Sequence, residues 1–280
     1  MRKILLINTT FIAVVTTSSV FAHEQAVEWT GFYAGLNAGY LWSNNSVDTT
    51  TTNVSTIPLL NGDIAGAVAA QGTGNVSTDN ESFIGGGQIG YNQQYREFFV
   101  FGIEADIQGL TSPTSEGSIM NSGLVEGANF DAVSTGLIES SESLDYLGTV
   151  RGRMGVLAMP NLFTYVTGGL AYGGVRTSTT ITEMLGFSDT PEPFGTSGNF
   201  SDTEFGWTAG AGLEWMFIQN LSAKLEYLYY DLGSVNNQLP QILQYGHDGT
   251  FLETVSDASS TTRFNGNVIR AGINYTFIGL

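Results

Sequence analysis

Charged residues of this chain recur two positions apart, as in Glu104 with Asp106 and Arg151 with Arg153. Side chains at positions i and i+2 of a β-strand point to the same face of a sheet. Each such pair therefore brings two charges to one place. Four acidic and four basic residues form the candidate set: Glu104, Asp106, Arg151, Arg153, Glu214, Lys224, Glu226 and Arg270.

These eight charges would face one another if their strands closed around a narrow lumen. Burying a charge is costly unless it is paired and hydrogen-bonded. Equal numbers of acids and bases therefore predict a salt-bridge network that fills the lumen. The same groups could form a selectivity filter or a proton path. A structural plug is favoured, because a barrel of eight strands leaves little room for a channel.

Other chemistry is sparse. The two histidines are His23 and His247, and His247 is a candidate ligand for haem or a metal, although a lone loop histidine is usually neither. No Ser-His-acid arrangement can be placed around it. The glycines at 85–87 lack the Lys-Ser/Thr that a phosphate-binding loop requires. We therefore expect a protein that is not an enzyme and carries no cofactor.

Net charge and cysteine content narrow the class further. The chain has 26 Asp and Glu against 9 Lys and Arg, which argues against binding nucleic acid because phosphate contacts need exposed basic residues. It has no cysteine. An exported protein without disulfides needs a large core or a closed barrel for stability.

The first residues predict export. Met1-Arg2-Lys3 is followed by an apolar stretch from Ile4 to about Val15, and small residues precede a cleavage site after Ala22. We expect a signal peptide over 1–22 and a periplasmic segment over 23–30. The alternative, a membrane anchor, is disfavoured because the apolar stretch is shorter than the ~20 residues of a spanning helix.

Eight segments of 13 to 15 residues alternate apolar with small or polar residues, which predicts β-strands. A tilted strand needs ~9–11 residues to cross a membrane. Short turns alternate with long connections, as in outer-membrane barrels with external loops. The segments are 31–43, 82–94, 98–110, 143–157, 162–176, 204–218, 221–233 and 264–278. The long connections are 44–80, 111–142, 177–203 and 234–262.

The two faces of these segments differ in a way that suits lipid outside. In 204–218, large apolar residues such as Trp207 and Leu213 share one face, whereas Glu214 shares the other with glycines. The faces of 162–176 stay ambiguous. With the N-terminus in the periplasm, the outward aromatics fall at two heights, as interfacial girdles do. The outer girdle is Tyr40, Trp42, Phe83, Tyr146, Trp207 and Tyr229. The inner girdle is Phe32, Tyr91, Phe99, Trp215, Phe217, Tyr275 and Phe277.

The four long connections contain fifteen Asp or Glu and no Lys or Arg. Such oxygen ligands could recruit divalent cations that bridge to lipopolysaccharide phosphates. The simpler interpretation is a solvated, repulsive surface, because no connection shows an ordered ligand spacing. Arg176 and Arg263 are expected at the outer rim.

The segments resemble the small outer-membrane β-barrel family, which includes OmpA-like barrels, opacity-type proteins, and the surface antigens and hemin-binding proteins of alphaproteobacteria. Gly31–Tyr40 is similar to the first strand, Tyr146–Val175 to the fourth and fifth, and Asn267–Phe277 to the closing strand. The resemblance implies an all-β, eight-stranded antiparallel up-and-down transmembrane barrel over 31–280 in the outer membrane of a Gram-negative bacterium.

Family members commonly end on an aromatic residue that the barrel-assembly machinery reads. Here Phe277 is followed by Ile278-Gly279-Leu280, so Phe277 is the candidate assembly signal despite its offset. The resemblance implies lipid, lipopolysaccharide and the assembly machinery as partners, with host surface molecules as further candidates.

Function is left open by the resemblance. The leading hypothesis is a structural surface protein that supports envelope integrity and meets the host or environment through its acidic connections. The second is a receptor for hemin or a host macromolecule, and the third a narrow pore. A soluble lipocalin-like carrier is disfavoured by the outward aromatics.

Overall fold

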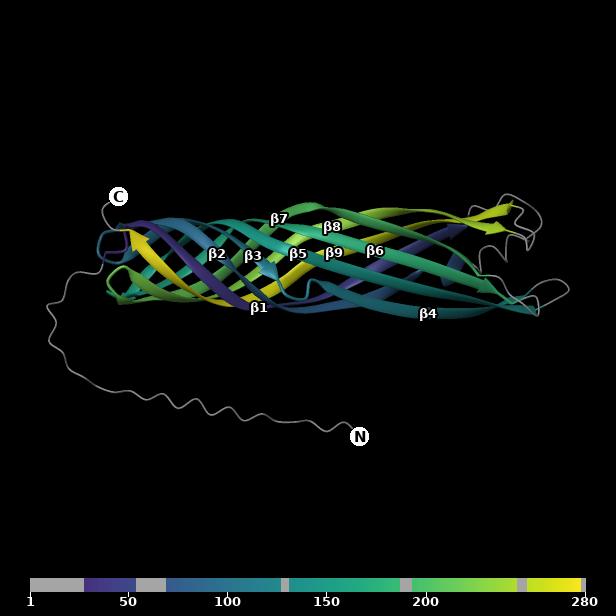
Figure 1. Ribbon diagram of the computed structural model, residues 1–280, viewed down its shortest axis with the longest axis horizontal. Helices are drawn as coiled ribbons and strands as arrows, with labels where there is room; N and C mark the ends of the chain where they lie inside the picture. The colour runs from purple at the N-terminus through teal and green to yellow at the C-terminus, as the bar shows by residue number, and fades with distance from the viewer. Residues whose placement is uncertain (1–27, 54–68, 127–130, 187–192, 246–250, 278–280) are drawn as a thin grey trace, which may run out of the picture.

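A computed structural model describes residues 28–53, 69–126, 131–186, 193–245 and 251–277. Nine β-strands make up almost all of these ranges (Figure 1). No helix within them is long and apolar enough to cross a membrane. The strands are β1 (Gly31–Asn53), β2 (Gly74–Tyr95), β3 (Phe99–Leu110), β4 (Thr114–Glu126), β5 (Asp131–Met159), β6 (Leu162–Leu185), β7 (Phe194–Ile218), β8 (Leu221–Tyr245) and β9 (Phe251–Phe277).

The strands form a closed antiparallel ring. Their order is β3-β2-β1-β9-β8-β7-β6-β5-β4, and an additional pairing of β3 with β5 closes the barrel. Consecutive strands are joined at one end by short turns, in which Arg96 and Asn220 take left-handed backbone conformations. The predicted all-β, up-and-down barrel is confirmed.

Strand β4 is the element that the sequence did not predict. Gly109 at the end of β3 pairs with Tyr146 of β5, and Thr114 at the start of β4 pairs with Ser143 of the same strand. β3 and β4 thus occupy one position in the ring, interrupted near Pro113. Proline has no backbone N–H to give to a ladder, so a break there costs few hydrogen bonds. Counting β3 and β4 together gives the expected eight positions.

The strands are much longer than predicted, because most of each presumed external loop is strand. β5 alone has 29 residues. At ~3.3 Å per residue it is far longer than the hydrocarbon layer is thick. The connections are rich in Thr and Ser, and buried residues, both apolar and small polar, alternate with more exposed ones along them. This alternation continues the barrel wall outside the membrane.

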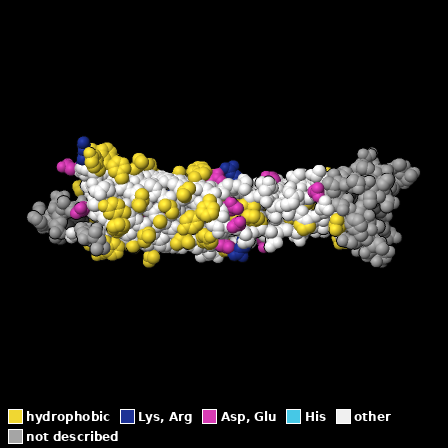
Figure 2. Space-filling view, turned by 90° about the horizontal axis from the view of Figure 1, so that it is seen from above, with side chains coloured by type: hydrophobic (Ala, Val, Ile, Leu, Met, Phe, Trp, Pro, Cys, Tyr) yellow, Lys and Arg dark blue, Asp and Glu magenta, His cyan; other side chains and the backbone are white. Residues whose placement is uncertain are grey.

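The outer surface divides this long wall into two parts. Exposed apolar side chains cover the end that carries the short turns, and a mostly polar surface with scattered charges follows (Figure 2). Aromatic pairs mark both borders of the apolar band. Tyr40 and Phe83 lie 5.4 Å apart at the outer border, and Tyr275 and Phe277 lie 5.1 Å apart at the inner one. We call the part beyond the outer border the extension.

Within the described residues of the extension the ring is not fully paired. The ladder between β2 and β3 stops at Ile84, and no ladder joins β2 to β4. The ladder between β7 and β8 stops at Trp207. The extension is therefore two four-stranded sheets, β2-β1-β9-β8 and β4-β5-β6-β7, packed face to face. Both seams begin at the outer girdle.

Candidate functional site

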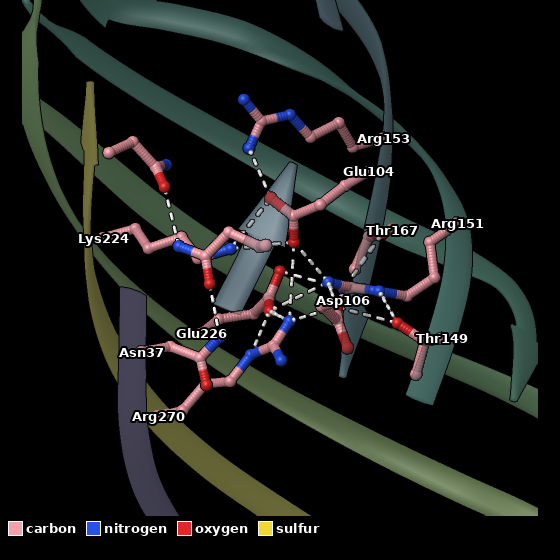
Figure 3. Close-up of polar contacts among 12 residues, drawn as sticks. Asn37, Glu104, Asp106, Thr149, Arg151, Arg153, Thr167, Lys224, Glu226 and Arg270 are labelled. Atoms are coloured by element: carbon pink, nitrogen blue, oxygen red, sulfur yellow. Dashed lines mark hydrogen bonds and ion pairs between the residues drawn. The ribbon is translucent and has the colours of Figure 1, made fainter. Parts of the chain in front are cut away.

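The eight charges predicted for the lumen come together in it, and Figure 3 labels all of them except Glu214. They project from β3, β5, β7, β8 and β9, and all are at most 5% exposed. Hydrogen bonds with residues of β1, β2 and β6 complete the cluster, which we call the lumen network. Because every acid has a basic partner, burial leaves no net charge inside the wall.

Glu104 lies at the centre of the lumen network. The Lys224 Nζ atom is 2.8 Å from each of its carboxylate oxygens, and the Arg151 Nη2 atom is 2.5 Å from Oε1. The Tyr33 hydroxyl donates to Oε2 at 2.8 Å. Arg270 approaches Oε1 at 3.4 Å. Charge-assisted bonds of this kind are the strong ones, so Glu104 fixes several strands at once.

Arg151 and Arg270 hold the other acids on the cell-surface side of this centre. Both approach the Asp106 Oδ2 atom, at 2.9 and 2.8 Å. Both also reach Glu226, Arg151 at 3.0 Å and Arg270 at 2.6 Å. Thr149 adds a hydroxyl bond to Asp106 at 2.8 Å. Two guanidinium groups therefore clamp two carboxylates across the lumen.

Arg153 occupies the periplasmic side of the lumen network. Its Nη1 atom is 2.9 Å from Glu214, and its guanidinium lies over the rings of Tyr33, Tyr165 and Phe163 at 4.5, 5.3 and 5.5 Å. Such cation–π contacts add to the ion pair because the guanidinium is buried. Sequence reasoning missed these aromatic partners, although Tyr33 and Tyr165 each alternate with outward neighbours.

Two apolar layers enclose the lumen network. The layer towards the cell surface comes from β1, β2, β5, β6, β8 and β9 and includes Leu147, Leu228 and Val268. The periplasmic layer contains Phe163 and the fully buried Trp29, whose Nε1 donates to the Pro160 carbonyl at 3.0 Å. Trp29 precedes β1, and its size and position before the first strand were the only available signals. The lumen network therefore lies between two apolar layers.

The extension has its own apolar cluster, with buried carboxylates above and below it. Val76, Ile138 and Ile242 belong to the cluster between the two sheets. Glu142 accepts hydrogen bonds from Asn45 at 2.8 Å and Thr78 at 2.9 Å, and burial raises its pKa to about 7. Burial raises the pKa of Glu183 to about 8, and neither of its oxygens has a partner among the described residues.

The remaining predicted residues lie at the periplasmic end of the barrel, at the border between the apolar band and the extension, or outside the described residues. Phe277 ends β9 and pairs with Phe32 of β1. Arg176 lies at the outer rim in an ion pair with Asp145, and Arg263 in one with Asp231. His247, His23 and the predicted signal peptide lie outside the described residues.

The arrangement suits static sealing. No group of three or more His, Cys, Asp or Glu side chains that could hold a metal occurs among the described residues. The charged groups lie between apolar layers, and each of them is at most 5% exposed. Their chemistry is therefore mutual neutralisation within the wall.

These features define a small β-barrel of the bacterial outer membrane. The family model for the outer membrane protein beta-barrel domain matches residues 11–277, and the chain belongs to that family. A 31 kDa outer-membrane immunogenic protein of Brucella melitensis is 33% identical over 255 residues, which cover 89% of this chain and 84% of that one. A 22 kDa outer membrane protein of Rhizobium leguminosarum is 31% identical over 62% of this chain and 65% of that one.

Solved structures similar to this chain are also outer-membrane barrels. OprG from Pseudomonas aeruginosa is 10% identical and matches with a TM-score of 0.40 over 90% of this chain and 98% of that one. Ail of Yersinia pestis is 10% identical, with a TM-score of 0.29 over 86% of this chain and 99% of that one. The family model and the relatives from Brucella and Rhizobium make the chain an outer-membrane protein of a Gram-negative bacterium, as its sequence predicts.

Proposed function

We propose that this protein is a sealed, non-enzymatic barrel that reinforces the outer membrane and carries a rigid extension to meet the host or environment. The observation that supports the proposal best is the lumen network, enclosed by an apolar layer on each side. A lumen filled in this way leaves no path for solutes to cross the membrane. Its ion pairs instead connect strands that are distant in the sequence.

The extension supports the second half of the proposal. Its strands continue the wall beyond the apolar band, so its surfaces stand clear of lipid. A paired, packed extension holds recognition surfaces in fixed positions, which lowers the entropy that binding must overcome. Lipid and lipopolysaccharide would contact the band and the rim, and host surface molecules the extension.

Conductance in planar bilayers tests the seal. We expect the purified barrel to give no steady, well-defined conductance steps. Regular steps in wild-type protein would contradict the proposal and favour a narrow pore.

A strain that lacks the protein tests the role in cells. We expect greater permeability of the envelope to a large dye and weaker attachment to host cells, both restored by the wild-type gene. Unchanged permeability and unchanged attachment together would refute the proposed role.

Assembly is proposed to depend on Phe277. Deleting Ile278-Gly279-Leu280 should leave surface exposure intact, because the aromatic residue then becomes the last one. Phe277→Ala in the full chain should reduce insertion. Loss of surface exposure on the deletion alone would show that the last three residues carry the signal.

A further inference from the structure

The two outer faces of the extension differ in composition. On β2-β1-β9-β8 the described outward side chains are almost all Asn, Ser, Thr, Asp or Gln, and none is a large exposed apolar residue. On β4-β5-β6 four large apolar side chains are exposed. They are Met120 at 68%, Leu124 at 73%, Val133 at 50% and Met184 at 39%.

These four residues form a patch on one sheet. Met120 pairs with Leu137, and Leu124 pairs with Val133, across the ladder of β4 and β5. Met184 pairs with Thr135 on the other side of β5. A polar stretch of the same face separates the patch from the membrane band. Contiguous apolar patches on a water-exposed surface usually mark interaction sites, and methionines adapt to partners of varied shape.

An acidic groove lies on the same face, between the patch and the membrane. Its volume is about 370 Å³, and its lining includes Glu116, Glu139, Ser118, Ser141 and Ser178. Ser118 pairs with Glu139 and Glu116 with Ser141, so Glu116 and Glu139 are diagonal neighbours, whose backbone positions lie ~7–8 Å apart in an antiparallel pair. Neither has an ion-pair or hydrogen-bond partner among the described residues. Two unpaired like charges this close repel each other, and a cation relieves that repulsion.

We propose that the outer face of β4-β5-β6 binds a cationic amphipathic helix of another protein or peptide. The apolar side of the helix would pack on Met120, Leu124 and Met184, and its Lys or Arg residues would pair with Glu116 and Glu139. A second copy of this chain is a poor occupant, because its net charge is −17. From Glu116 to Leu124 the strand covers ~26 Å, which matches a helix of about 18 residues.

The inference rests on the surface role proposed above, and binding to purified protein tests it separately. The probe is a fluorescent 18-residue helical peptide of Lys and Leu, titrated against the full barrel in phosphatidylcholine nanodiscs. Empty nanodiscs give the background. We expect Glu116→Gln/Glu139→Gln to weaken binding at least tenfold, and Met120→Ser/Leu124→Ser to weaken it by a similar factor.

The matched control is Asp48→Asn/Asp257→Asn, which removes the same charge from the opposite sheet. We expect it to change affinity less than twofold. An equal loss of affinity in the two charge variants would mean that the acidic protein attracts the cationic peptide without a specific site. That result would overturn the proposal. So would tight binding of a twin peptide with Glu in place of Lys, or binding no greater than to empty nanodiscs. None of these results would affect the seal, which conductance measures.

Discussion

The membrane-spanning part of the barrel and its extension are built from the same strands, yet they differ in the side chains that face inward and outward and in how completely their strands are paired. In the membrane, charges lie inside and apolar side chains outside, and every neighbouring pair of strands is joined by a ladder. In the extension, the interior between the two sheets combines an apolar cluster with many buried Ser, Thr and Asn side chains, and the outside is mostly polar. Two ladders are missing among its described residues.

The difference follows from the solvent. Lipid cannot satisfy a backbone N–H or C=O group, so a wall within the membrane must be closed all round. Water can satisfy these groups, so the extension tolerates two seams. Side chains bridge them in places: the Ser115 hydroxyl donates to the Asp79 carbonyl, and the Thr196 hydroxyl donates to the Pro240 carbonyl at 2.7 Å.

The strongest test of the membrane half removes the centre of the lumen network. Glu104→Gln leaves Lys224 and its neighbours without a counter-charge in a buried site. We expect a loss of about 3–5 kcal/mol in the free energy of unfolding, measured by urea titration in lipid vesicles.

Lys224→Met combined with Glu104→Gln is the control for this prediction. It removes a charge of each sign, and we expect it to recover part of the loss. A single variant as stable as the wild type would show that the lumen network contributes little to stability.

Proline substitutions on one strand test the contrast in ladders directly. Ala211 and Ser201 both lie on the outer face of β7, and by the alternation of strand bonding their N–H groups point towards β8. Ala211 pairs with Tyr227, whereas Ser201 lies beyond the end of that ladder. We expect Ala211→Pro to lower the folded fraction strongly, because proline in the middle of a sheet removes a ladder hydrogen bond.

Ser201→Pro should cost about 1 kcal/mol or less, since its N–H gives no bond to β8. Gel migration of unheated samples measures the folded fraction. Equal damage from both substitutions would mean that the seam is paired in solution.

Acidity should affect the extension more than the membrane half. The pKa of Glu142 is raised to about 7 and that of Glu183 to about 8, above the ordinary value near 4.5. The folded state therefore holds more protons, and its stability falls as pH rises from about 4.5 through these pKa values. We expect hydrogen exchange in the extension to be at least tenfold faster, relative to a reference peptide, at pH 9 than at pH 5.

Glu183→Gln should remove most of this pH dependence, because the amide stays neutral. If the variant keeps the full dependence, the titration arises elsewhere.

The smallest effect is expected at the rim, where the two halves meet. The Arg176 side chain is 61% exposed and pairs with Asp145. Exposed ion pairs contribute little and are screened by salt. Arg176→Gln should leave the urea midpoint unchanged at 0.15 M salt, and a clear shift would assign the rim a structural role.

Much of the membrane half could be predicted from sequence. Residues such as Glu214 and Trp215 alternate strictly there. Positions that face lipid require apolar side chains, and positions that face the narrow lumen require small or paired polar ones. Segment 162–176 stayed ambiguous because Phe163 and Tyr165 point inward, where charges were expected; they pack on Trp29 and Arg153.

The extension could not be predicted in the same way. Thr and Ser can be exposed to water on a strand as readily as in a loop, so composition does not distinguish the two. The polar composition of these connections therefore led to a prediction of loops. Ile138 and Ile181 were the available signals for a second core, but isolated apolar residues in a polar stretch are weak ones. Partners in the lumen network, such as Tyr33, depend on which strands face one another across the barrel.

Trp29, seated in the periplasmic mouth, has a consequence for fluorescence. The chain has four tryptophans. Trp207 and Trp215 are half exposed on the apolar band and Trp42 lies at its border, whereas Trp29 is 1% exposed. Brominated lipid should therefore quench three of the indoles and spare the fourth. The emission that survives would report, in an unlabelled protein, whether the mouth of the barrel is shut.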